Sequence, residues 1–134
     1  MKRYVTDTQC LLWHMAQDRH LPKAVKSIFD ASEDGRVQVL VPSMVLVETV
    51  FLLQRQRIKQ SVLDQLLQLS EEPDASMCVV PLDMNVVQAV TDFGPASVPE
   101  LADRVIAATA RALGLPLLTV DPAIVESALV KVIR

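Results

Sequence analysis

The chain has 134 residues, the usual length of one domain, and a domain of this size buries roughly two thirds of its unfolded surface. Hydrophobic residues make up 51% and aromatic residues only 4%, which predicts an aliphatic core and excludes disordered and fibrous proteins. The net charge of -3 excludes a broad basic surface that neutralises many phosphates. We therefore predict one domain over residues 1–134 whose contacts with nucleic acid are local.

The first half of the chain alternates short β-branched runs with helical patterns. In chain order we predict a strand at Arg3–Thr6, helices at Thr8–Gln17 and Pro22–Ser32, a strand at Val37–Val41, and helices at Met44–Leu53 and Ser61–Leu69. The Met44–Leu53 helix is apolar on nearly every face, so we expect it to be buried. Ser43 directly precedes this helix and is predicted to be its N-cap.

The second half of the chain repeats this alternation. After a loop at Glu71–Ala75 we predict a strand at Cys78–Leu82, a helix at Asn85–Phe93, a linker at Gly94–Ser97, a long helix ending at Gly114, a strand at Leu117–Val120, a helix at Pro122–Leu129 and a short edge strand at Val130–Ile133. Ser97 and Glu100 have capping-box spacing at the start of the long helix, and Gly114 suits a left-handed C-terminal cap.

Strands separated by helices imply parallel pairing with right-handed crossovers. The predicted fold class is therefore α/β, a three-layer α/β/α sandwich around a parallel sheet of four or five strands. In such open sheets the ligand crevice lies beyond the carboxyl ends of the strands, where the strand order reverses. Candidate functional residues are expected at that edge.

Several other kinds of protein and site are not expected. The longest apolar stretch, Val39–Leu53, is shorter than the ~20 residues of a membrane span, and no signal-peptide cleavage site appears, so we expect a cytoplasmic protein. Cys10 and Cys78 lack metal-ligand spacing and are predicted to be reduced structural thiols. His14 and His20 have no paired ligand at useful spacing, so surface or capping roles are expected.

Two aspartates follow predicted strands at the edge where a parallel sheet binds ligands. Asp7 comes directly after the first strand, and Asp121 comes directly after the fourth. Both positions also suit a helix N-cap, and Asp121 precedes Pro122, a preferred first helical residue. Capping and metal binding are compatible, because an aspartate can offer one oxygen to each.

Two further acids lie on helices that should face the core. Glu48 is the one charged residue within the apolar helix, and a buried carboxylate requires a cation, a metal or a proton. A tertiary ion pair with Arg104 is the alternative explanation for it. Asp103 lies on a face of mostly small residues and should point inward. Glu100 is one turn earlier on that face and is assigned a supporting role.

The chemistry follows from these four acids together. Four carboxylates at one edge repel each other unless cations hold them, and ligation by oxygen alone favours Mg²⁺ or Mn²⁺ over zinc. Such ions bind phosphate oxygens and activate water for in-line attack on phosphorus. Hydrolysis of phosphodiester bonds is the predicted reaction.

The sequence resembles the PIN-domain family, and within it the VapC-type toxins of toxin–antitoxin pairs, over essentially the whole chain. The segments that carry the resemblance are TDTQCLLW at 6–13, PSMVLVE at 42–48, ADRVIAATA at 102–110 and GLPLLTVD at 114–121. The resemblance implies that the metal ligands or their orienting neighbours are Asp7, Glu48, Asp103 and Asp121, with Thr8, Ser43, Thr119 and Glu100 in support. Glu100 departs from the family, which often has aspartate at that position.

The resemblance also implies properties that composition cannot supply. These are a sheet ordered 3-2-1-4-5, a Mg²⁺ or Mn²⁺ cofactor, single-stranded or structured RNA substrates such as tRNA or rRNA, and frequent homodimers. It implies as well a cognate antitoxin whose tail fills an apolar groove and obstructs the acids. The function so predicted is a metal-dependent endoribonuclease, the toxin of such a pair.

Alternatives remain open for several residues and for the function. Arg55, Arg57 and Arg104 are weak candidates for RNA contacts, although Arg55 and Arg57 also suit a solvated helix end. Trp13 suits either core packing or a protein–protein anchor. Gln9 stands where a haloacid-dehalogenase-like enzyme needs a second aspartate. The rival from another class is a catalytically silent PIN-like module that binds RNA or protein, which retention of all four acids disfavours.

Overall fold

The computed structural model describes residues 1–134, and its five strands form one parallel sheet in the order β3-β2-β1-β4-β5. The strands are β1 (Arg3–Thr6), β2 (Gln38–Pro42), β3 (Met77–Val80), β4 (Leu117–Leu118) and β5 (Val132–Ile133). The helices are α1 (Thr8–Ala16), α2 (Lys23–Glu33), α3 (Ser43–Gln54), α4 (Gln60–Leu67), α5 (Met84–Val90), α6 (Leu101–Leu113) and α7 (Pro122–Ser127). The predicted α/β/α sandwich and strand order are confirmed, with element ends shifted by a few residues.

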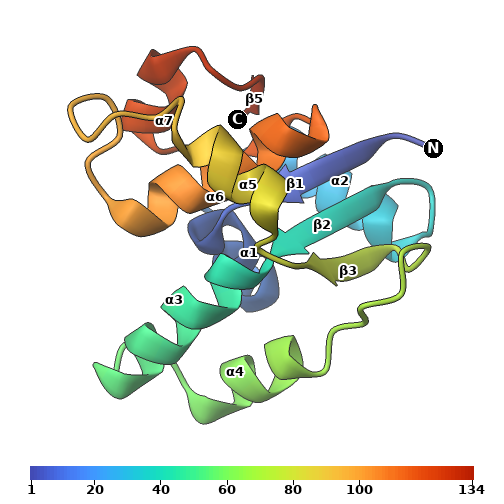
Figure 1. Ribbon diagram of the computed structural model, residues 1–134. Helices are drawn as coiled ribbons and strands as arrows, with labels where there is room; N and C mark the ends of the chain where they lie inside the picture. The colour runs from blue at the N-terminus through green and yellow to red at the C-terminus, as the bar shows by residue number, and fades with distance from the viewer.

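The sheet lies between helical layers. Figure 1 shows α5 and α6 in front of the sheet and α2 behind it, and α6 contacts β1 while α2 contacts β2. All five residues of β2 are buried, as expected of an inner parallel strand covered on both faces. The core is one cluster of 23 buried apolar residues, most of them aliphatic.

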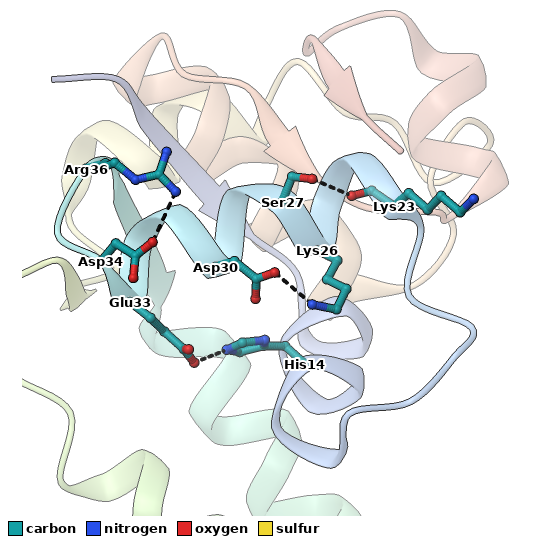
Figure 2. A network of polar contacts seen from close by, with 8 residues as sticks. All are labelled: His14, Lys23, Lys26, Ser27, Asp30, Glu33, Asp34 and Arg36. Carbon is teal, nitrogen blue, oxygen red and sulfur yellow. Dashed lines mark hydrogen bonds and ion pairs between the residues drawn. The ribbon is translucent and has the colours of Figure 1, made fainter.

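Helices α1 and α2 are joined by a histidine that stacks on a phenylalanine and contacts a glutamate. The His14 ring stacks on Phe29 with centroids 4.3 Å apart, and its Nε2 atom lies 3.0 Å from Glu33 Oε1 (Figure 2). The His14 side chain is only 16% exposed, so it has neither the surface nor the capping role predicted for it. The Lys26–Asp30 pair in the same view is exposed and contributes little stability.

Two predicted helix caps are wrong. Helix α3 begins at Ser43 itself, and Pro42 occupies the cap position, because β2 continues through the proline. Helix α6 begins after Glu100, whose side chain makes no capping bond, while the Ser97 hydroxyl donates to the Gly94 carbonyl at 3.0 Å. The left-handed cap at Gly114 is confirmed, with φ of 66°.

The prediction that the apolar helix is buried is also wrong. In α3 only Val45 and Thr49 are buried, whereas Val47 is 43% exposed and Phe51 is 55% exposed. The helix packs against β2, α1, α4 and α6, and these neighbours do not surround it. Because its sequence has no polar face, the pattern could not show which side would be left open. No helix in the structure has the length and hydrophobicity needed to cross a membrane.

The α6 packing generates a stability prediction. Ile106 is fully buried in the core cluster, so Ile106→Ala should lower the free energy of unfolding by about 2–5 kcal/mol, because a cavity is left behind. Leu101→Ala, at the exposed start of the same helix, should change it by about 0.5 kcal/mol or less. Urea denaturation followed by circular dichroism measures both, and equal losses would contradict the packing described.

Candidate active site

The two central strands bring their carboxyl ends together. Strands β1 and β4 are hydrogen-bonded neighbours, with Thr6 paired to Leu118, and the Asp7 N–H extends the ladder to the Leu118 carbonyl at 3.1 Å. Asp121 follows β4 after two residues. The chain crosses from one side of the sheet to the other between these strands, and that is where open α/β sheets bind ligands.

Thr119 ties the two strand-end aspartates to each other. Its hydroxyl donates to Asp7 Oδ2 at 2.5 Å and accepts from the Asp121 N–H at 3.1 Å. The other Asp7 oxygen, Oδ1, accepts from the Cys10 N–H at 2.8 Å and so caps α1. Asp7 is therefore almost completely buried, at 6% exposure, with both of its oxygens fixed.

Asp121 caps α7, as its position before Pro122 predicted. Its Oδ1 accepts from the Ala123 N–H at 2.9 Å and from the Ile124 N–H at 3.1 Å. These bonds use one carboxylate oxygen and fix the direction of the side chain. Asp103 on α6 lies close enough to Asp121 for the Asp121 charge and side chain to raise the pKa of the Asp103 carboxyl.

Glu48 is held by a hydroxyl group from another helix. The Thr8 hydroxyl donates to Glu48 Oε1 at 2.5 Å, which joins the first turn of α1 to the middle of α3. The predicted alternative, an ion pair with Arg104, is not formed. The Arg104 Nη2 atom donates instead to the Pro99 carbonyl at 3.2 Å, and its buried Nε atom has no partner.

All four acids line one open pocket of about 460 Å³. The other residues around it are Thr8, Gln9, Leu12, Trp13, Leu52, Val120 and Pro122. The acids come from the cap of α1, from α3, from α6 and from the cap of α7. The pocket therefore combines a strongly acidic wall with an apolar one, and we call it the acid pocket.

The electrostatics of the acid pocket show crowding of like charge. Burial raises the pKa of Asp103 to about 7, and the charge and hydrogen bond of Asp121, then the charges of Glu48 and Asp7, add to the effect. Burial also raises the pKa of Asp7, against the hydrogen bonds from Thr119 and Cys10, which lower it. The full set of negative charges is therefore costly without a counter-ion.

The donor chemistry of the acid pocket suits a hard cation. Oxygen is the only ligand atom that the four acids offer, which favours Mg²⁺ or Mn²⁺. No three His, Cys, Asp or Glu side chains are arranged as a ready-made metal site. Because Mg²⁺ keeps several waters and takes one or two carboxylates directly, the arrangement fits an ion bound partly through water.

Not every predicted residue lies at the acid pocket. Thr8 lines it and Thr119 supports it from behind, but the residues that do not line it are Ser43, Arg55, Glu100 and Arg104. Arg57 lines an adjoining groove. Burial raises the pKa of the Cys10 thiol, as the charge of Asp7 also does, so Cys10 stays protonated. Both cysteines are free and buried, as predicted.

The apolar wall of the acid pocket was missed by the sequence analysis. Leu12 and Trp13 belong to this wall from α1 and Leu52 from α3, while the polar side chain of Gln9 lines the same pocket. The contribution of α1 could have been predicted from the sequence, because a helix that starts at a strand-end acid places its first two turns beside that acid. The position of Leu52 could not have been predicted, since the orientation of α3 is set by tertiary packing.

Comparison with known protein families identifies the family of this chain. A family model of the PIN domain matches residues 4–128. The chain belongs to the PIN-domain family. No curated protein sequence matches it.

Solved structures with a similar fold come from toxin–antitoxin systems. VapBC2 from Rickettsia felis, bound to a DNA fragment from its promoter, matches with a TM-score of 0.70 at 14% identity, over 98% of this chain and 97% of that one. DNA-bound VapBC from Salmonella typhimurium matches with a TM-score of 0.64 at 16% identity, over 99% of this chain and 98% of that one. A toxin–antitoxin complex from Klebsiella pneumoniae gives 0.59 at 16% identity, over 98% and 96%. At these identities the likeness shows the fold.

The raised pKa of Asp103 predicts how stability depends on pH. Its value of about 7 in the folded chain exceeds its usual 3.8, so the folded state binds the proton more tightly and the free energy of unfolding falls as pH rises between these values. Without divalent cations the loss should be on the order of 1–2 kcal/mol after solvent screening. Asp103→Asn should remove most of this pH-dependent loss of stability, as measured by urea denaturation across the same pH range. An unchanged pH dependence would contradict the repulsion among the four acids.

Proposed function

We propose that this PIN-domain protein is a metal-dependent endoribonuclease that hydrolyses phosphodiester bonds in single-stranded or structured RNA. Members of the family are generally nucleases. The observation that supports the activity for this chain is the convergence of Asp7, Glu48, Asp103 and Asp121 on one pocket. These four residues are the proposed metal-holding and catalytic groups.

The proposed mechanism gives the acids two kinds of task, which are holding the cation and accepting a proton. Asp7 and Glu48 have oxygens fixed by Thr119, Cys10 and Thr8, so they can hold a cation without first becoming ordered. Asp121, whose Oδ1 is fixed by its cap bonds, would hold the cation with them, and Asp103 in the same pocket would accept the proton of an attacking water. A bound Mg²⁺ or Mn²⁺ supplies charge neutralisation at the phosphate and activation of water.

The biological role that we propose is that of a toxin controlled by a cognate antitoxin. Its support is the fold shared with the VapBC complexes and with the Klebsiella toxin–antitoxin complex. An antitoxin segment over the acid pocket would block RNA and metal alike. The competing function is a catalytically silent PIN-like module that binds RNA or protein. Both oxygens of the Asp7 carboxylate are fixed by hydrogen bonds, and this preorganised geometry favours the catalytic role.

Cleavage assays with acid variants test the activity. Asp7→Asn and Glu48→Gln should each lower the rate of single-stranded RNA cleavage in Mg²⁺ or Mn²⁺ by roughly 100-fold or more, because a charged group beside the reacting phosphate is removed. EDTA should stop the wild-type reaction. Circular dichroism checks that the variants remain folded.

A matched control separates the site from contaminating nuclease. Glu126→Gln removes an exposed acid from α7 that does not line the acid pocket, so its cleavage rate should equal that of the wild type. Cleavage that survives in Asp7→Asn and Glu48→Gln would refute the assignment. RNA binding by the wild type without any cleavage, at all metal concentrations, would establish the silent module.

The proposal includes a homodimer, for which the exposed side of α3 is the suggested contact surface. Val47 and Phe51 are one turn apart on this helix and remain exposed, and covering them in a second copy would remove apolar area from water. Phe51→Lys should therefore lower the average mass measured by sedimentation equilibrium toward that of one chain. A wild-type protein that stays monomeric at high concentration would contradict the dimer.

A further inference from the structure

A second and larger groove adjoins the acid pocket. It has a volume of about 650 Å³ and lies between α1, α3 and α4, the last two of which run side by side in Figure 1. The groove and the acid pocket share Gln9, Leu12, Trp13 and Leu52. The two hollows therefore adjoin each other, and we call them together the α3–α4 track.

The two ends of the α3–α4 track carry opposite charge. The four acids lie at one end, and Arg57 and Lys59 line the other. Both cations are exposed, and neither takes part in an ion pair. The backbone of Arg57 is fixed, because its N–H donates to the Leu52 carbonyl at 2.9 Å across a turn in which Gln56 has φ of 59°.

Trp13 stands where the two hollows meet. Its half-buried side chain lines both of them, and its ring stacks on His20 with centroids 5.9 Å apart and an interplanar angle of 26°. His20 is held in turn by Asp18, whose Oδ1 lies 2.7 Å from the ring Nδ1 and accepts from the His20 N–H at 2.8 Å. The indole is thus an ordered aromatic surface beside the acids.

We infer that the α3–α4 track binds one strand of RNA, with Trp13 stacked on an unpaired nucleobase near the scissile phosphate and Arg57 and Lys59 holding a phosphate further along. This inference rests on the proposed ribonuclease function. Stacking on an aromatic ring requires a base that is out of the duplex, and every base has a face to offer. The track therefore selects single-stranded substrate and reads little sequence.

Charge and shape favour a nucleic-acid strand as the occupant. A strand offers phosphates at intervals with apolar base faces between them, which matches a basic end, an apolar floor and an acid end that accepts phosphate through a cation. A peptide would instead need acidic groups at the Arg57 end and basic groups at the Asp7 end. A second copy of this chain would bury the cations of the track without supplying phosphate.

Binding experiments use the single tryptophan of the chain as the reporter. In Asp7→Asn protein with Mg²⁺, a short single-stranded oligoadenylate should quench Trp13 fluorescence, and a duplex of the same length should not. Trp13→Leu should weaken binding of a fluorescein-labelled oligoadenylate about ten-fold, measured by anisotropy, and Trp13→Phe should restore most of the affinity, because one stacked base is involved.

Salt dependence tests the basic end of the track. Arg57→Ala and Lys59→Ala should each reduce the slope of log affinity against log salt concentration by about 0.7 for every phosphate that the variant no longer neutralises. Arg55→Ala is the matched control, since Arg55 is exposed in the same segment but lines neither hollow. In proteins with intact acids, the Arg57 and Lys59 variants should raise KM for RNA and leave kcat unchanged.

The outcomes separate this inference from the proposed function. If acid variants lose cleavage while the Trp13, Arg57 and Lys59 variants bind and cleave as the wild type does, the ribonuclease stands and the track is refuted. If these three variants instead alter the mass of the protein in solution and leave RNA affinity unchanged, the groove is a surface between copies. A peptide that quenches Trp13 where oligoadenylate does not would assign the groove to a protein partner.

Discussion

The hydrogen bond from Thr119 to Asp7 joins the ends of the two central strands, and the arrangement of the acid pocket depends on it. Thr119 is fully buried and uses the same hydroxyl oxygen to accept from the Asp121 backbone. One side chain thus fixes the carboxylate that starts α1 and the turn that starts α7. The cap bonds of both aspartates then set where these helices leave the sheet, so the fold and the site share their polar contacts.

The acid pocket is electrostatically unfavourable, and the rest of the fold supplies the stability that offsets this repulsion. Four carboxylates around one hollow repel each other, and burial raises the pKa of Asp103 and Asp7. The aliphatic core and the packing of α6 against the sheet supply the stability that makes this repulsion tolerable. A site that is unfavourable when empty binds a cation the more strongly, because the cation relieves repulsion already present in the folded chain.

The parts of this structure that sequence predicts well are those set by local pattern and by the geometry of parallel sheets. Asp7 and Asp121 could be placed together because both directly follow strands of one sheet. The partner of Glu48 could not, since Thr8 is forty positions away. The prediction of a Ser97–Glu100 capping box is wrong, because residues 94–98 close a turn of their own through hydrogen bonds to the Gly94 carbonyl. The side of α3 that faces the core could not be predicted, because a helix that is apolar on every side does not indicate which side is buried.

The position of Cys10 makes its thiol unreactive towards oxidants. Its backbone N–H holds Asp7, and its thiol is buried directly beside that carboxylate, which keeps the sulfur in the protonated form. Thiolates react with peroxides and electrophiles, and protonated buried thiols do not. Although Cys10 bonds to Asp7, its thiol therefore does not make the acid pocket sensitive to oxidation. Changes in the thiol balance of its surroundings leave the Asp7 carboxylate in place.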